Sequence, residues 1–139
     1  MQGKTSVPGE MERTYIAAAD EYSLFYRELR LQLQSNGVQI VESPTEATAT
    51  LSIHFDRTDQ RVLSVSARNT PTEYEVYYSI EYSLDSGEKN LQPQQFITLT
   101  RDYTYDETLV LGKSHEEQVL REAIVDDLVR TVLRQLGSL

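Results

Sequence analysis

The sequence predicts an α+β two-layer sandwich, a mixed but mostly antiparallel sheet with two helices packed on one face. Three observations predict it: a long stretch of strict apolar–polar alternation, two segments with helical periodicity, and a strand–helix–strand order ahead of a three-strand meander. Alternation with period two is typical of a sheet with one apolar face, and a 3.6-residue period is typical of an amphipathic helix. Because every apolar face must be buried, both helices are expected on the same side of the sheet.

The first third of the chain predicts an extended leader, a strand and a helix. Residues 1–10 hold two glycines and a proline among polar residues, and we expect them to be extended. A short strand is expected over residues 14–18. Helical spacing begins at Glu21, and Asn36-Gly37 is expected to end the helix because glycine adopts the left-handed C-cap conformation. The apolar stripe of this helix consists of Tyr22, Phe25, Leu29 and Leu33.

The middle of the chain predicts a short strand and then the meander. Residues 38–41 give a few strand positions, and residues 48–67 a long strand with Leu51, Ile53 and Phe55 on its apolar face. The polar break at residues 57–61 is interpreted as a β-bulge. Residues 73–84 alternate most clearly, with tyrosine or aliphatic residues at every even position. A turn at residues 85–87 leads into a return strand over residues 95–105.

Capping residues predict both ends of the last helix. Ser114-His115-Glu116-Glu117 matches the capping-box pattern, and Gly137 follows the final turn as a stop. Leu120, Ile124, Leu128 and Val132 form its apolar stripe.

Composition limits the classes of function. The chain has 139 residues, so we expect one domain over residues 1–139. A hydrophobic share of 39% and a charged share of 25% exclude a largely disordered protein. The net charge of -9 argues against nucleic acid as a partner, because phosphate-backbone binding needs a cationic face. The absence of cysteine excludes disulfides and thiol chemistry.

Catalytic patterns are weak. His54 is expected on the polar face of a strand and His115 inside a helix cap, and no hydrolase, metalloprotease or nucleotide-binding motif occurs. We therefore expect no enzyme, no metal and no cofactor. The alternative of a small hydrolase or isomerase would depend on a polar cup of Glu73, Glu75 and Asp102. Tyr77 shares the polar strand face and is expected to be exposed, as a candidate protein contact.

Two basic residues are predicted to form an anion site. In an up-down-up meander, the turn after the first strand and the exit of the third strand lie at one end of the sheet. Arg68 lies in that turn and Lys113 directly precedes the last helix, 45 positions later. The N-terminus of a helix also favours anions. Arg68 and Lys113 are therefore the candidate binding residues for a phosphate or carboxylate group.

The same residues lie in segments that resemble a known family. RNTPTEYEVYYSIEYSL, and the stretch from FITLTRDYTYDE through LGKSHEEQVLREAI to the last helix, resemble the LptE (RlpB) family. The resemblance extends over nearly the whole chain. It implies a lipoprotein that plugs the LptD outer-membrane β-barrel, assists its assembly and binds lipopolysaccharide. The basic residues to which the family's lipopolysaccharide contact is ascribed correspond to Arg68 and Lys113.

The resemblance also implies a location. Family members are anchored by a lipid on the periplasmic side of the outer membrane, whereas this chain shows neither a signal peptide nor a lipobox cysteine. We therefore expect a processed form of a lipid-anchored protein, with the anchor missing here. A periplasmic adaptor that binds only protein is the second alternative, and a lipopolysaccharide titration separates the two.

Overall fold

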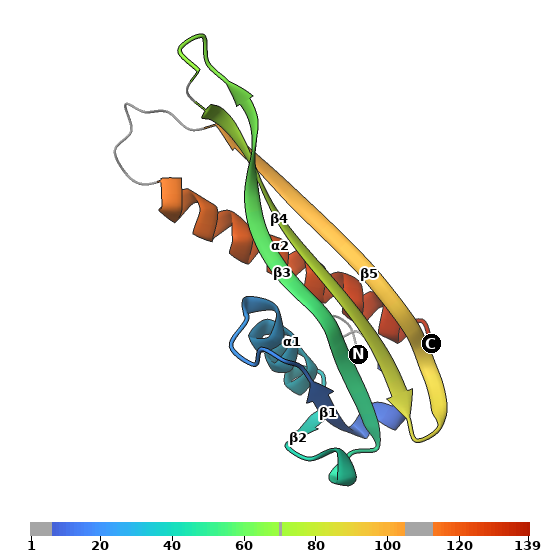
Figure 1. The fold of residues 1–139 in the computed structure, drawn as a ribbon. Helices are drawn as coiled ribbons and strands as arrows, with labels where there is room; N and C mark the ends of the chain where they lie inside the picture. Colours follow the sequence, from blue (N-terminus) through green and yellow to red (C-terminus); the bar gives the residue numbers. More distant parts are fainter. Residues whose placement is uncertain (1–6, 70, 105–112) are drawn as a thin grey trace.

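The structure is a computed structural model that describes residues 7–69, 71–104 and 113–139. Its elements follow the predicted strand–helix–strand–meander–helix order (Figure 1). In chain order they are η1 (Gly9–Glu12), β1 (Arg13–Ala17), α1 (Leu24–Ser35), β2 (Gln39–Val41), η2 (Pro44–Glu46), β3 (Ala49–Val65), β4 (Pro71–Ser86), β5 (Lys89–Thr104) and α2 (Lys113–Gly137). Gly9 and Glu10, expected to be extended, begin the 3₁₀ helix η1 instead.

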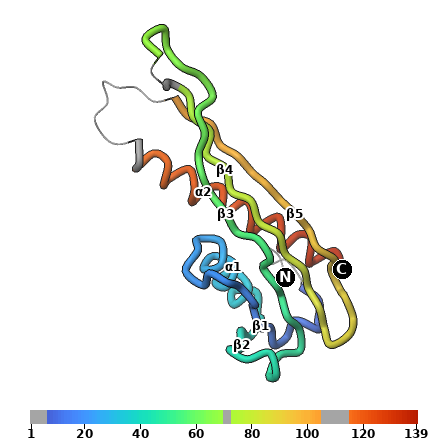
Figure 2. Tube along the Cα trace, viewed as in Figure 1, coloured from blue at the N-terminus to red at the C-terminus, as the bar shows by residue number. Residues whose placement is uncertain are grey.

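The five strands form one open sheet in the order β2-β1-β3-β4-β5. β1 pairs in parallel with both β2 and β3, and β3, β4 and β5 pair antiparallel. The connection from β1 to β2 passes through α1, as parallel neighbours require. The tube in Figure 2 shows β3, β4 and β5 as long, twisted neighbours that extend beyond the shorter β1 and β2. The predicted mixed, mostly antiparallel sheet is confirmed.

Both helices cover the same face of this sheet. The alternating side chains of β4 turn that face into the core, and Tyr78, Ile80 and Leu84 are almost fully buried. The Tyr78 ring lies 6.5 Å from the ring of Phe25 on α1, and the Tyr82 hydroxyl donates a hydrogen bond to Gln135 on α2. α2 crosses behind β3, β4 and β5 in Figure 1. The predicted two-layer packing is confirmed.

α1 begins later than its periodicity suggests. Ser23 caps it, because its Oγ accepts a hydrogen bond of 2.9 Å from the Tyr26 backbone N–H. Tyr22 therefore lies before the helix and is 86% exposed, so its placement on the apolar stripe was wrong. Phe25, Leu29 and Leu33 are buried as predicted. Gly37 ends the segment with a φ of 90°, the conformation expected of it.

β3 contains a bulge at a different position from the predicted one, and its register with β4 shifts again between Val62 and Val65. Residues 57–61 pair regularly with β4, whereas the register shifts between Ile53 and Phe55 and leaves His54 as the extra residue. An extra residue turns the following side chains to the opposite face. Phe55 is therefore 40% exposed on the outer face, not buried beside Ile53 as expected. Asp56 faces the helices instead.

The inverted register lets Asp56 join the sheet to α1. The Asp56 carboxylate accepts hydrogen bonds of 2.6 Å from both the Ser23 and the Tyr78 hydroxyls. The Tyr78 hydroxyl accepts one from the backbone N–H of Phe25 at 3.3 Å. Burial and the Asp56 carboxylate raise the pKa of Tyr78 well above its usual value, so this hydroxyl remains protonated and donates.

The β4–β5 hairpin is longer than predicted. β5 begins at Lys89, six residues before the expected start, and continues through Pro93. Proline is tolerated there because β5 is the outermost strand on its side of the sheet. No helix within the described part of the chain is long and apolar enough to cross a membrane.

Candidate functional site

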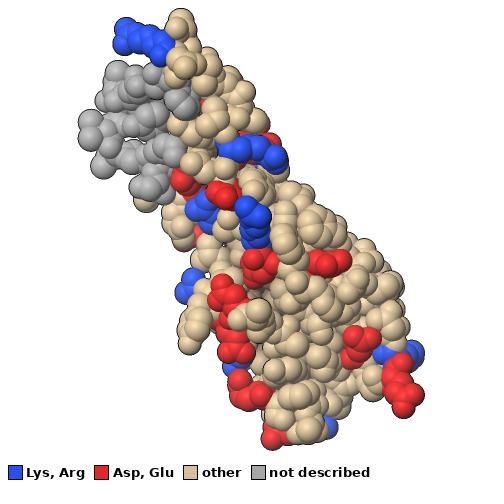
Figure 3. Space-filling view, in the orientation of Figure 1, with Lys and Arg blue, Asp and Glu red and all other residues tan. Residues whose placement is uncertain are grey.

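The turn between β3 and β4 carries Arg68 at the far end of the long hairpin. Ser66 organises the turn, because its carbonyl accepts from the Asn69 N–H at 2.8 Å and its Oγ accepts from the Arg68 N–H at 3.2 Å. Asn69 has a φ of 64°, a left-handed conformation that asparagine tolerates. The Arg68 side chain is exposed. Figure 3 shows basic atoms at the end of the molecule where this turn lies.

Exposed aliphatic side chains precede Arg68 on the same hairpin end. Val62, Leu63 and Val65 are 49%, 46% and 52% exposed, respectively. Their exposure follows from the length of β3, which continues past the part of the sheet that the helices cover (Figure 1). Residues 62–69 contain one basic residue and no acidic residue, although the whole chain has a net charge of -9. The hairpin end, residues 62–69, thus combines one exposed cation with exposed aliphatic side chains on an acidic protein.

The N-terminal end of α2 lies toward the same end of the molecule as the β3–β4 turn (Figures 1 and 2). Arg121 donates a 2.8 Å hydrogen bond from Nε to the Thr58 hydroxyl on β3. The Tyr103 hydroxyl on β5 donates at 2.6 Å to Glu117. Burial, followed by this carboxylate, raises the pKa of Tyr103. These contacts fix the first turns of α2 against the meander.

Lys113 is the first residue of α2. Its side chain, the side chain of Ser114 and residues 105–112 lie outside the described part. Because α2 begins at Lys113, Ser114 lies inside the helix and not at the N-cap position that the predicted capping box gave it. The structure therefore places the backbone elements that carry Arg68 and Lys113 toward one end. Close approach of the two side chains remains a prediction.

Two of the three residues of the enzyme alternative, Glu73 and Glu75, have side-chain partners on the neighbouring strand. Glu75 pairs with Arg61 and Glu73 accepts a 2.6 Å hydrogen bond from Ser64, both on the outer face of the sheet. Asp102 lies opposite Glu75 in the strand register and is exposed. His54 is exposed and shares a 2.7 Å hydrogen bond with Ser83. No group of three or more potential metal ligands occurs among the described residues.

Tyr77 is less exposed than predicted. The Arg61 guanidinium lies 4.8 Å from the centre of its ring and covers it, so the tyrosine is only partly exposed. Such a cation–π contact can form because Arg61, Glu75 and Tyr77 share the outer face of neighbouring strands. The observed role of Tyr77 is therefore to pack against Arg61, and a contact with another protein stays a prediction.

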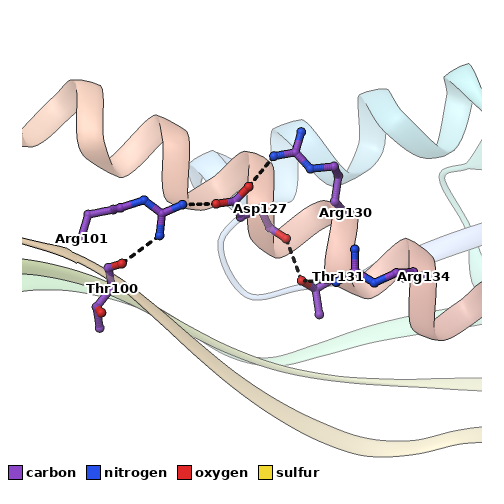
Figure 4. Close-up of polar contacts among 6 residues, drawn as sticks. All are labelled: Thr100, Arg101, Asp127, Arg130, Thr131 and Arg134. Carbon is purple, nitrogen blue, oxygen red and sulfur yellow. Dashed lines mark hydrogen bonds and ion pairs between the residues drawn. The ribbon is translucent and has the colours of Figure 1, made fainter.

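A second polar cluster, absent from the sequence-based predictions, joins β5 to α2. Asp127 accepts hydrogen bonds from both Arg101 on β5 and Arg130 one turn further along α2 (Figure 4). The hydrogen bond from Arg130, followed by the one from Arg101, lowers the pKa of Asp127. Arg101 and Asp127 are 26 positions apart in the sequence, so local sequence patterns do not predict that they pair.

The fold and the hairpin end together define a two-layer α+β domain with a basic, apolar projection and no assembled catalytic group among the described residues. A family model described as "LptE: Lipopolysaccharide-assembly" matches residues 11–136. The chain belongs to this LptE lipopolysaccharide-assembly family, as its resemblance predicted.

Individual relatives agree with the family. The chain is 23% identical over 137 residues to the LPS-assembly lipoprotein LptE of Yersinia enterocolitica, and 24% identical over the same length to that of Yersinia pestis. Both alignments cover 98% of this chain and 66% of the relative, so the chain spans about two thirds of the length of these curated relatives.

Solved structures show the same fold. Lipoprotein B from Nitrosomonas europaea is 26% identical with a TM-score of 0.82, covering 99% of this chain and 89% of that one. The rare lipoprotein B from Shewanella oneidensis is 25% identical with a TM-score of 0.77, covering 91% and 94%. A minor lipoprotein from Acinetobacter baumannii, 18% identical, reaches a TM-score of 0.74 over 92% of both chains and supports the fold alone.

Proposed function

We propose that this chain is a non-enzymatic subunit of the outer-membrane lipopolysaccharide translocon. In this role it plugs and assists assembly of the LptD barrel, and it binds lipopolysaccharide through Arg68 and Lys113. The native protein is anchored by a lipid on the periplasmic side of the outer membrane. Membership of the LptE family supports the role in assembly, and the names of the curated relatives support the lipid anchor.

The observation that carries the lipopolysaccharide proposal is the hairpin end. Lipopolysaccharide combines phosphate groups with acyl chains, so a binding surface needs a cation beside apolar side chains. Arg68 offers a planar guanidinium suited to bidentate phosphate binding. Val62, Leu63 and Val65 offer exposed aliphatic area beside it. Attraction at this point is local, because charges farther away than about 8 Å are screened at physiological ionic strength.

A titration with charge-reversed variants tests the site. Arg68→Asp combined with Lys113→Asp should weaken lipopolysaccharide binding while the circular dichroism spectrum stays unchanged. Lys89→Asp combined with Arg134→Asp is the matched control, since it reverses two charges on other exposed surfaces. Unchanged affinity of the first variant would remove the site assignment. A wild-type chain without measurable affinity would favour the adaptor that binds only protein.

The partnership with the barrel has its own test. Co-expression with the LptD of the same organism, followed by purification through a tag on one partner, should yield a stable complex of the two proteins. The polar outer face of β3, β4 and β5 and the loops at the sheet ends are the proposed contact. Failure to isolate a complex in detergent would contradict the proposed role as a plug.

A further inference from the structure

α1 and α2 leave between them a groove that no described part of the chain fills. It has a volume of about 470 Å³ and lies where one stripe of each helix faces the other. α1 contributes residues spaced i, i+3, i+4 and i+7, and α2 contributes residues spaced i, i+3 and i+4, a spacing that places each set on one helix face. The lining residues are Leu24, Arg27, Glu28, Leu31, Glu122, Val125 and Asp126.

The groove has an apolar floor and an apolar rim. Val125 is 3% exposed and forms part of the core, whereas Leu31 is 59% exposed. α1 buries its other stripe completely, with Leu29 and Leu33 at 0%. Leu24 and Leu31 therefore form a second apolar stripe on α1 that packing among the described residues covers only in part. A helix that is apolar on two sides is typical of one that meets a partner on the second side.

The edges of the groove are acidic. Glu28, Glu122 and Asp126 oppose a single cation, Arg27. Glu28 accepts a 2.9 Å hydrogen bond from Gln32 and Glu122 a 3.1 Å one from Gln118, both neutral donors on the same helix. None of the ion pairs found between described residues includes any of these three carboxylates. Acidic atoms also gather over α1 on the face seen in Figure 3.

We infer that the α1–α2 groove binds a basic segment of the barrel protein, with a leucine-sized side chain of that segment seated against Leu31 and Val125. Seven residue steps from Leu24 to Leu31 give the groove a length of about 10 Å, which matches about two turns of an amphipathic helix. Lysine or arginine residues flanking the apolar side chain would meet Glu28 on one edge and Glu122 and Asp126 on the other. This inference rests on the proposed barrel partnership and concerns a different surface from the hairpin end.

Photo-crosslinking in the co-expressed complex tests the inference. With p-benzoylphenylalanine at position 31, ultraviolet light should join this chain to one barrel segment, and mass spectrometry should find more lysine and arginine than aspartate and glutamate there. The same group in place of Glu88, in the β4–β5 turn, is the positional control and should not yield this product. The variant Glu122→Gln with Asp126→Asn should weaken the complex about fivefold at low salt, as expected for two exposed ion pairs.

A control variant removes the same charge elsewhere. Glu12→Gln with Glu116→Gln lies outside both the groove and the proposed sheet contact and should leave the affinity unchanged. A complex that forms normally without a crosslink from position 31, or with a crosslink to an acidic segment or to a second copy of this chain, overturns the inference and leaves the proposed function intact. Equal weakening by both double variants also overturns it. Absence of any complex contradicts the proposed barrel partnership together with the inference.

Discussion

Removing one hydroxyl at the centre of the sheet tests how α1 is held. The Tyr78 hydroxyl donates to the Asp56 carboxylate at 2.6 Å and accepts from the backbone N–H of Phe25 at 3.3 Å. Tyr78→Phe keeps the ring, which is 1% exposed, and deletes both hydrogen bonds. A hydrogen bond to a charged group contributes about 1.5–3 kcal/mol, and the N–H of Phe25 would lose its partner in the core. We expect a loss of about 2 kcal/mol in the free energy of unfolding.

The corresponding shift in melting temperature follows from chain length. Unfolding entropy near the midpoint is about 2.1 cal/mol/K per residue, which gives about 0.3 kcal/mol/K for this chain. A loss of about 2 kcal/mol therefore lowers the midpoint by about 7 °C. Thermal denaturation followed by circular dichroism measures the shift, and urea denaturation gives the free energy directly.

Two further variants make the result decisive. Tyr22→Phe deletes a hydroxyl from a side chain that is 86% exposed and should change the free energy of unfolding by less than about 0.5 kcal/mol. Asp56→Asn completes a double-mutant cycle with Tyr78→Phe, and a coupling energy of about 1 kcal/mol or more is expected for the direct contact. If Tyr78→Phe melts like Tyr22→Phe, or if the cycle gives no coupling, the reasoning about this cluster is refuted.

Three other expectations concern the core, the salt-bridge cluster and the hairpin end. Leu128→Ala, at a fully buried position of α2, should cost about 2–5 kcal/mol in chemical denaturation, and a cost below about 1 kcal/mol would contradict the packing described. Arg130 and Arg101 lower the folded-state pKa of Asp127, so its ionised carboxylate stabilises the fold above the unfolded pKa of about 3.9, and this stability is lost as the pH falls through the folded value. Asp127→Asn should therefore reduce the loss of stability on acidification. A pH profile of stability identical to that of the wild type would refute this. Leu63→Ser should weaken lipopolysaccharide binding while the melting temperature stays within about 2 °C, since the side chain is 46% exposed; unchanged binding would exclude Leu63 from the lipid contact.

The sequence was most informative where one periodicity extends over many residues. The even positions of β4 are buried from Tyr74 to Leu84, as the alternation predicts, because a half-buried strand tolerates no slip of register. The apolar stripe of α2 was predicted for the same reason. The direction of the chain through the meander also placed the turn of Arg68 and the start of α2 toward one end.

Other features depend on contacts that no local pattern records. The bulge at His54 was assigned to residues 57–61, because polar residues suggest an interruption while the inserted residue itself looks ordinary. Its result, Asp56 facing the helices, makes sense only once Ser23 and Tyr78 are placed beside it. The α1–α2 groove likewise arises from the packing of two helices about 90 positions apart in the sequence. Each helix taken alone gives no sign of it.

The inner position of β1 affects the local stability of the N-terminal part of the fold. Within the described sheet, β2 pairs with β1 alone, and β1 joins it to β3. Loss of residues 13–17 would thus remove two strands instead of one and leave α1 with its contacts to α2, β3 and β4. Amide protons of Tyr15 and Ile16 should consequently exchange with deuterium as slowly as those deep in the meander, an unusual degree of protection so early in a polypeptide.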